Sequence, residues 1–220
     1  MAGYGLLIFD LDGTLFQTET VTIPAVRQSF WAQGLPVPTT EEICSFFGKP
    51  GSEFHAWLAS RCPQDKTSEL MAAIDRTELE LISQTGELYP QIQEVLATLR
   101  ASVSQMAVCS NGPQTYIERV LAVHGLRLFF DAVKYRRSAQ DTKPRMIREL
   151  LEHLASRPAI VIGDRCDDIE AAHQNGLKAI SATYGYGRAE ELGSADAAAA
   201  SPSELPRLVR TLLELPPRKL

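Results

Sequence analysis

Two aspartates stand close together near the start of the chain, in the segment Asp10-Leu11-Asp12-Gly13-Thr14-Leu15. They follow an apolar run at residues 5–9, a pattern typical of a strand buried on both faces. Two carboxylates this close repel each other unless a cation or a shared proton lies between them. The pair therefore predicts acid–base or metal chemistry at the end of that strand, although an aspartate-rich turn without function also fits the pattern.

A second acidic cluster, Gly163-Asp164-Arg165-Cys166-Asp167-Asp168, follows another apolar run and opens a helical pattern. Helix capping accounts well for one aspartate at such a place and poorly for three. If the two strands are neighbours, the carboxylates of Asp10, Asp12, Asp164 and Asp168 converge. Such an oxygen-rich pocket suits Mg²⁺, and whether Asp168 or Asp167 would touch the ion directly stays open.

Two further segments have the chemistry to hold a phosphate group. Ser110-Asn111 ends a third apolar run and offers a hydroxyl group and backbone N–H groups, and Lys143 begins a helix in Thr142-Lys143-Pro144. Each alone is more simply read as a turn or a solvated lysine. All four segments together, each at a strand end or a helix start, indicate a phosphate-handling site.

The elements that must position these residues alternate between strands and helices. Apolar runs at residues 5–9, 106–109, 159–162 and 178–182 predict buried strands, and apolar stripes at 91–100, 114–124, 144–155 and 168–175 predict helices between or after them. This alternation predicts an α/β fold with a Rossmann-like parallel sheet and helices on both faces. Ligands of such sheets bind beyond the carboxyl ends of the strands.

One region interrupts the alternation. Residues 16–89 contain helical patterns at 23–31, 41–47, 52–60 and 68–82, and no good strand. We expect a small α-helical cap domain at 16–89, inserted after the first strand into a core made of residues 1–15 and 90–220. An alanine-rich stretch at 195–200 is expected at a sheet edge or in a loop, residues 205–213 in a closing helix, and residues 216–220 in a frayed tail.

Composition excludes several classes of protein. The 220 residues are 45% hydrophobic and 22% charged, which is ordinary for a globular domain, and the net charge of −5 argues against nucleic acid or an anionic membrane as the main partner. The four cysteines form no C-x-x-C pair and are expected to be free thiols. No run is long enough to span a membrane. We expect a cytoplasmic monomer or homodimer, with the choice of oligomeric state left open.

These four segments, in this order, resemble the motifs of the haloacid dehalogenase-like hydrolase superfamily, from residue 6 to about residue 187. The cap resembles that of the branch that includes phosphoglycolate phosphatase and β-phosphoglucomutase. The resemblance implies that Asp10 is the nucleophile and Asp12 the general acid and base. It implies that Asp10, Asp12 (through its backbone carbonyl), Asp164 and Asp168 surround Mg²⁺. Ser110, Asn111 and Lys143 would bind the phosphoryl group.

The leading hypothesis is a Mg²⁺-dependent phosphatase that hydrolyses a small phosphorylated metabolite, phosphoglycolate-like or a sugar phosphate, through an aspartyl-phosphate. Asp12 argues against dehalogenase and phosphonatase chemistry, because relatives with those activities differ after the nucleophile. A sugar phosphomutase stays open, as does a phosphate-binding protein without turnover. Lys49, in the cap turn Gly48-Lys49-Pro50-Gly51, is a candidate substrate-specificity residue, or else a solvated turn lysine.

Overall fold

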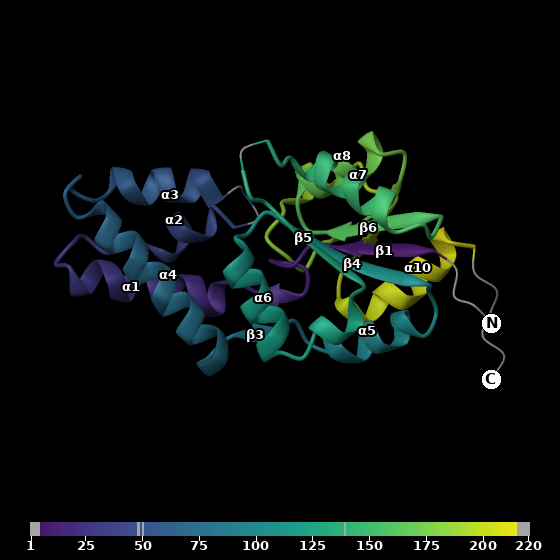
Figure 1. The fold of residues 1–220 in the computed structure, drawn as a ribbon, viewed down its shortest axis with the longest axis horizontal. Coiled ribbons are helices and arrows are strands. Elements are labelled where there is room, and N and C mark those ends of the chain that lie inside the picture. The colour runs from purple at the N-terminus through teal and green to yellow at the C-terminus, as the bar shows by residue number, and fades with distance from the viewer. Residues whose placement is uncertain (1–4, 48, 50, 139, 215–220) are drawn as a thin grey trace.

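Six parallel strands form one sheet in the computed structural model, which describes residues 5–47, 49, 51–138 and 140–214. The order is β5-β4-β1-β6-β7-β8 (Figure 1). The strands are β1 (Leu6–Phe9), β4 (Gln105–Ser110), β5 (Ala132–Tyr135), β6 (Ala159–Gly163), β7 (Lys178–Ala182) and β8 (Ala197–Ala199). The predicted parallel sheet is confirmed.

β1 is the centre of the fold because both of its faces are buried. Leu7 and Phe9 belong to the apolar core on one side of the sheet, and Leu6 and Ile8 belong to the core on the other side. All four side chains are fully buried. A strand enclosed in this way is apolar at every position, which is why it reads as a continuous run in the sequence.

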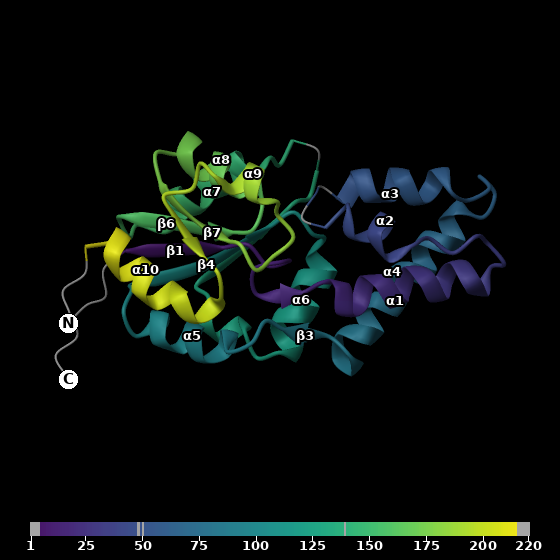
Figure 2. The same ribbon diagram turned by 180° about the vertical axis from the view of Figure 1, so that it is seen from behind.

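Helices cover both faces of the sheet, as predicted. One face carries α5 (Ile92–Arg100), α6 (Gln114–Val123) and α10 (Leu205–Leu212), and the other carries α7 (Lys143–His153) and α8 (Cys166–Gln174). The short α9 (Ala189–Leu192) packs beside α8 (Figure 2). Two short 3₁₀ helices, at Arg127–Phe129 and Pro202–Glu204, complete the core.

A group of four helices lies beyond the carboxyl ends of the strands (Figure 1). They are α1 (Glu19–Ala32), α2 (Thr40–Cys44), α3 (Gly51–Ser60) and α4 (Thr67–Gln84). Phe30 of α1 and Leu70 and Ile74 of α4 are among the buried side chains that join these helices to the main core cluster. The helical cap expected after the first strand is therefore present.

Two short strands at the root of the cap depart from the expectation that this region has no strand. β2 (Phe16–Gln17) pairs antiparallel with β3 (Glu87–Leu88). Two residues are too few to give a periodic signal, so the sequence pattern does not reveal them. We propose that this pair marks the border between the core at 1–15 and 90–220 and the cap at 16–89.

The two edge strands of the sheet, β5 and β8, differ in how well the sequence predicts them. β5 was not predicted, because its four residues are only half-buried and include Lys134, which pairs with Glu149. β8 lies in the alanine-rich stretch and forms the other edge, as expected. Gly48, Pro50 and the predicted tail at 216–220 lie outside the described residues.

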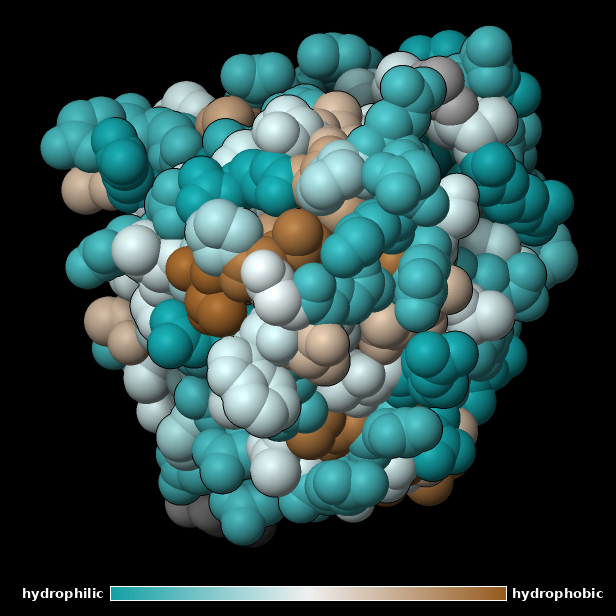
Figure 3. Space-filling view, turned by 90° about the vertical axis from the view of Figure 1, so that its left-hand side faces the viewer, coloured by the Kyte–Doolittle hydropathy of each residue, from teal (hydrophilic) through white to brown (hydrophobic). Residues whose placement is uncertain are grey.

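The face of the molecule at the cap end is mostly hydrophilic, with hydrophobic side chains gathered in small patches (Figure 3). Within the described ranges, no helix combines the length and the apolar character needed to cross a membrane. All four cysteines, Cys44, Cys62, Cys109 and Cys166, are free thiols, as predicted.

Candidate active site

The sheet brings three of the predicted segments together. β1 lies between β4 and β6, with Phe9 in register with both Val108 and Ile162. Three polar residues therefore lie side by side at the carboxyl ends of adjacent strands, and each is buried: Asp10, Ser110 and Asp164. Parallel strands end on one side of a sheet, so their pairing alone gathers these side chains.

Lys143 is a buried cation among these carboxylates. Its Nζ lies 3.2 Å from Asp10 Oδ1 and forms a second ion pair with Asp168 Oδ1. Lys143 and Asp10 are each 3% exposed and Asp168 is 1% exposed, so the charges have almost no water around them. Lys143 is therefore a member of the cluster and not a solvated surface lysine.

Three carboxylates form a compact group with a shared centre. One oxygen each from Asp10, Asp164 and Asp168 lies within 4.8 Å of the others. Asp164 Oδ2 accepts a hydrogen bond from the backbone N–H of Tyr186 at 2.7 Å, and Asp168 Oδ2 accepts one from the N–H of Arg165 at 3.1 Å. Asp168 thus caps α8 with one oxygen and faces Lys143 with the other.

Burial makes this cluster electrostatically costly without a further cation. Burial raises the pKa of Asp10 to about 7 and that of Asp164 to about 8, and it raises the pKa of Asp168 well above its usual range. Lys143 opposes each of these shifts. The carboxylates in turn hold the pKa of Lys143 above its usual value, although burial alone would lower it.

The donor set fits a divalent metal ion. Three carboxylates and one ammonium leave two uncompensated negative charges in a buried place, and a divalent cation balances both. Carboxylate oxygens are the ligands that hard cations such as Mg²⁺ prefer. Asp167 lies outside the group, since its Oδ2 accepts a hydrogen bond from Asn111 Nδ2 at 2.8 Å.

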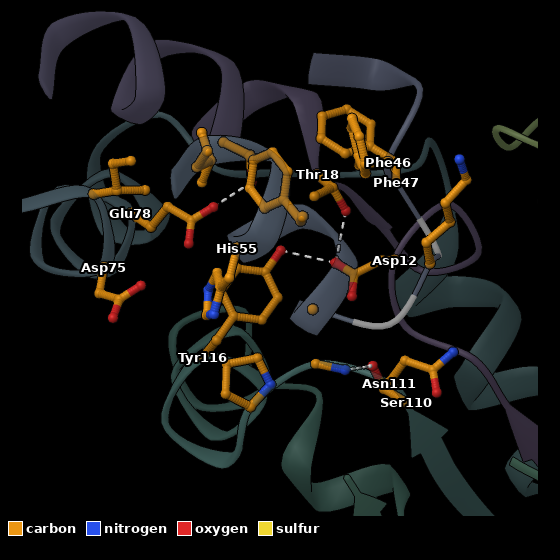
Figure 4. Close-up of a pocket in the computed structure, with 18 of the residues that line it drawn as sticks. Asp12, Thr18, Phe46, Phe47, His55, Asp75, Glu78, Ser110, Asn111 and Tyr116 are labelled. Atoms are coloured by element: carbon orange, nitrogen blue, oxygen red, sulfur yellow. Dashed lines mark hydrogen bonds between the residues drawn. The ribbon is translucent and has the colours of Figure 1, made fainter. Parts of the chain in front are cut away.

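Asp12 occupies a different environment from Asp10. Its Oδ1 accepts hydrogen bonds from Thr18 Oγ1 at 2.6 Å and from the Tyr116 hydroxyl group at 2.8 Å (Figure 4). Burial raises the pKa of Asp12, and these two hydrogen bonds oppose the shift. Two donors on one oxygen fix the orientation of the carboxyl group.

Ser110 and Asn111, two of the predicted phosphate-binding residues, make different kinds of contact. Ser110 Oγ accepts a hydrogen bond from the N–H of Gly112 at 3.1 Å, and its hydroxyl group also hydrogen-bonds the Asp12 carboxylate, which lowers the pKa of Asp12. The side chain of Asn111 instead bonds Asp167, so it ties the end of β4 to the start of α8. Both residues line the cavity described next.

A cavity of about 110 Å³ lies between the core and the cap. The core contributes Asp10, Asp12, Ser110, Asn111, Gly112, Pro113 and Tyr116 to its wall, and cap side chains enclose the remainder. Figure 4 shows Asp12, Ser110 and Tyr116 facing the same space as His55 and Glu78 of the cap. The cap residues in its wall are Thr18, Thr22, Phe46, Phe47, Lys49, Gly51, Phe54, His55, Leu58, Met71, Ile74, Asp75 and Glu78. Lys49, the candidate specificity residue, lines this cavity, with its Nζ 5.0 Å from the centroid of the Phe46 ring.

A core loop around Tyr186 closes against both the acidic cluster and the cap. The Tyr186 ring packs against Phe47 with centroids 4.8 Å apart, and its hydroxyl group bonds the Glu19 carboxylate. Arg165 adds a second link, because its guanidinium donates to the Phe47 carbonyl at 2.8 Å. This loop therefore holds Asp164 and the cap in one arrangement.

Sequence reasoning missed Thr18, Tyr116 and Glu78. Thr18 and Tyr116 contact Asp12, and Glu78 lines the cap end of the cavity. A signal existed for Tyr116, which lies six residues beyond Ser110 near the start of a helix that opens at the strand ends. Thr18 and Glu78 lie in the cap, and nothing in their local pattern distinguishes them from ordinary helix residues.

Comparison with known proteins places the chain in a family. The family model for haloacid dehalogenase-like hydrolases matches residues 7–182. The chain belongs to the haloacid dehalogenase-like hydrolase family. Within it, the similarity falls in the branch of phosphoglycolate phosphatases and β-phosphoglucomutases, as the resemblance of the cap implied.

Individual relatives agree with this placement. A phosphoglycolate phosphatase of Vibrio cholerae is 28% identical over 207 residues, which cover 89% of this chain and 92% of that protein. The structure of CbbY from Rhodobacter sphaeroides, solved in complex with phosphate, is 25% identical with a TM-score of 0.77 and covers 91% of this chain and 95% of that one. A predicted phosphoglycolate phosphatase of Haemophilus somnus, 21% identical, shares the fold with a TM-score of 0.85 over 95% of this chain and 99% of that one.

The contact between Tyr116 and Asp12 generates a prediction about leaving groups. If Asp12 protonates the leaving oxygen, Tyr116→Phe should lower kcat/KM about tenfold for an alkyl phosphate, because a hydrogen bond to a charged group contributes about 1.5–3 kcal/mol. For p-nitrophenyl phosphate, whose leaving group needs no proton, the loss should be much smaller. Steady-state kinetics on both esters measure the difference, and an equal loss on both would show that Tyr116 serves only structure.

The close packing of the Tyr186 loop generates a second prediction. A Cβ at Gly185 would lie 2.3 Å from the Gly13 carbonyl oxygen and 2.4 Å from Asp164 Cβ. Gly185→Ala should therefore lower the free energy of unfolding by about 1–3 kcal/mol and reduce activity. Gly193→Ala is the matched control, because a Cβ there meets its nearest atom at 3.9 Å. Urea unfolding of both variants decides, and equal stabilities would contradict the packing argument.

Proposed function

We propose that this hydrolase is a Mg²⁺-dependent phosphatase that cleaves a small phosphate monoester through an aspartyl-phosphate on Asp10. The family and its relatives support phosphatase activity. The observation that carries the mechanism is the division of labour between two aspartates. Asp10 lies against Lys143 in the acidic cluster, whereas Asp12 lies outside it and is oriented by two hydroxyl groups.

In the first step, a carboxylate oxygen of Asp10 attacks phosphorus and the bond to the leaving alcohol breaks. Asp12 gives its proton to the leaving oxygen, so that the product is a neutral alcohol and not an alkoxide. Lys143 places a positive charge beside Asp10, and Ser110 donates a hydrogen bond to the phosphoryl oxygens. Both stabilise the negative charge that spreads over those oxygens in the transition state.

In the second step, the ionised Asp12 takes a proton from water as the water oxygen attacks phosphorus. The bond between phosphorus and Asp10 breaks, which releases phosphate and restores both carboxyl groups. The raised pKa of Asp12 suits a group that must be protonated in one step and ionised in the next. The cap covers the site and limits the entry of water.

A metal ion completes the site in this proposal. Asp10, Asp164, Asp168 and the backbone carbonyl of Asp12 would hold it. Bound there, Mg²⁺ would supply positive charge to the phosphoryl oxygens and offset the repulsion between the carboxylates and the substrate. The chain's own Lys143 provides one charge only, which is insufficient for three buried carboxylates.

The first test is phosphate release from a panel of phosphorylated compounds that includes phosphoglycolate, sugar phosphates and nucleotides. The wild type should release phosphate from small monoesters, and Asp10→Asn should lose this activity by about 10³-fold or more, because an amide cannot serve as the nucleophile. Asp65→Asn, the same change at an exposed cap position, is the control and should retain full activity.

The panel also separates the alternatives. Consumption of a hexose phosphate with no release of phosphate would replace the phosphatase by a phosphomutase. Binding without any turnover would indicate a phosphate-binding protein. Full activity of Asp10→Asn would eliminate Asp10 as the nucleophile.

Metal dependence is tested by chelation. EDTA should abolish phosphate release and Mg²⁺ should restore it. Mg²⁺ at about 100 times its Kd should also stabilise the fold by about 2.7 kcal/mol, because it binds only the folded chain, and Asp164→Asn should reduce this gain. Turnover that persists in EDTA, together with a Tm that Mg²⁺ leaves unchanged, would refute the metal site.

A further inference from the structure

The cap end of the cavity contains a carboxylate that the proposed reaction does not use. Glu78 lies on α4, and Met71, Ile74, Asp75 and Glu78 recur at the spacing of one helix face, all in the cavity wall. Figure 4 shows Glu78 extending from α4 toward the interior, with Asp75 and His55 nearby. This end of the cavity lies opposite the end formed by Asp10, Asp12 and Ser110.

Glu78 is held in place with one oxygen still available. Its Oε1 accepts a hydrogen bond from Thr22 Oγ1 on α1, the helix that packs most extensively against α4. This hydrogen bond is made to Oε1, and Oε2 takes no part in it. Burial raises the pKa of Glu78 to about 7, so the ionised carboxylate gains from any donor that reaches it.

The charges around Glu78 disfavour a negatively charged organic group. Asp12 and Asp75 are near enough to raise the pKa of Glu78 further. Lys49 is the one lysine or arginine among the described residues of the wall, and its ammonium already lies over the Phe46 ring. A substrate carboxylate in this end would therefore face like charges, with Lys49 and the His55 imidazole as its basic neighbours against three carboxylates.

The walls between the two ends are apolar. Phe46, Phe54, Leu58, Met71 and Ile74 line the space that the organic group must cross. Apolar walls with a few placed polar groups are the usual form of a small-molecule site. Here the polar group at the far end is an acceptor, so the matching group on the substrate is a donor.

We infer that Glu78 determines specificity by accepting a hydrogen bond from the organic part of the substrate. The inference rests on the proposed phosphatase function and narrows it to one substrate class. The substrate is a small phosphate monoester whose alkyl part carries a hydroxyl or ammonium donor, and not a carboxylate. Phosphoglycolate is then a poor substrate, although several relatives are named for it.

The test compares kcat/KM for alkyl phosphates that differ only in the terminal group: amino, hydroxyl, methyl or carboxylate, each with two spacer lengths. The wild type should prefer the amino or the hydroxyl compound over the methyl compound by about tenfold or more, since a hydrogen bond to a charged acceptor contributes that much. The carboxylate compound should be the poorest. The compound with the higher kcat/KM, amino or hydroxyl, identifies the donor group, and either result supports the inference.

Glu78→Gln is the matching variant, because it keeps the shape and the acceptor for Thr22 but removes the charge. In this variant, kcat/KM for the amino compound divided by kcat/KM for the carboxylate compound should fall about tenfold or more. A general loss of activity lowers both values equally and leaves their ratio unchanged. Glu80→Gln, the same change on the same helix but outside the cavity wall, should leave the ratio unchanged.

The two proposals fail in different ways. No phosphate release from any compound, p-nitrophenyl phosphate included, would reject the phosphatase itself. A wild type that prefers the carboxylate compound, or does not distinguish the terminal groups, would overturn the role of Glu78 while the phosphatase stands. An unchanged ratio in Glu78→Gln would do the same.

Discussion

The placement of Lys143 between Asp10 and Asp168 is the interaction on which the site depends. An ion pair buried this deeply is stabilising only where its partners are held in good geometry, and removal of one partner leaves an uncompensated charge at a cost of about 3–5 kcal/mol. The sheet supplies that geometry. β1 and β6 fix the ends from which Asp10 and Asp164 emerge, and α7 and α8 present Lys143 and Asp168 to the same point.

The acidic cluster could be predicted from the sequence because the parallel sheet that creates it is regular. Buried parallel strands are apolar throughout, so their ends are sharp, and polar residues at those ends must lie along one edge of the sheet. Asp10, Ser110 and Asp164 could be placed in this way from the sequence alone. Their register came only with the structure, as did the finding that Asp168 both caps α8 and pairs with Lys143.

The cap end of the site could not be read in the same way. Thr18 and Glu78 lie on cap helices or next to them, where a single polar residue has the same local pattern whether it faces water or a cavity. Their contacts depend on how the cap meets the core, which no local periodicity encodes. Strand β5 escaped prediction for a related reason, since a half-buried edge strand lacks the continuous apolar run of a central one.

The loop at Tyr186 has a consequence for how the molecule responds to ligands. Its backbone N–H holds Asp164, while its ring and hydroxyl group hold Phe47 and Glu19 of the cap. If the proposed metal is bound, a change in cap position that moves this loop would also change the affinity for the metal, and such coupling is reciprocal. A ligand that favours this arrangement of the cap would raise the affinity for the metal by some factor. The metal would raise the affinity for that ligand by the same factor. A substrate that engages the cap would then strengthen metal binding, and a substrate that does not engage the cap would lack this effect.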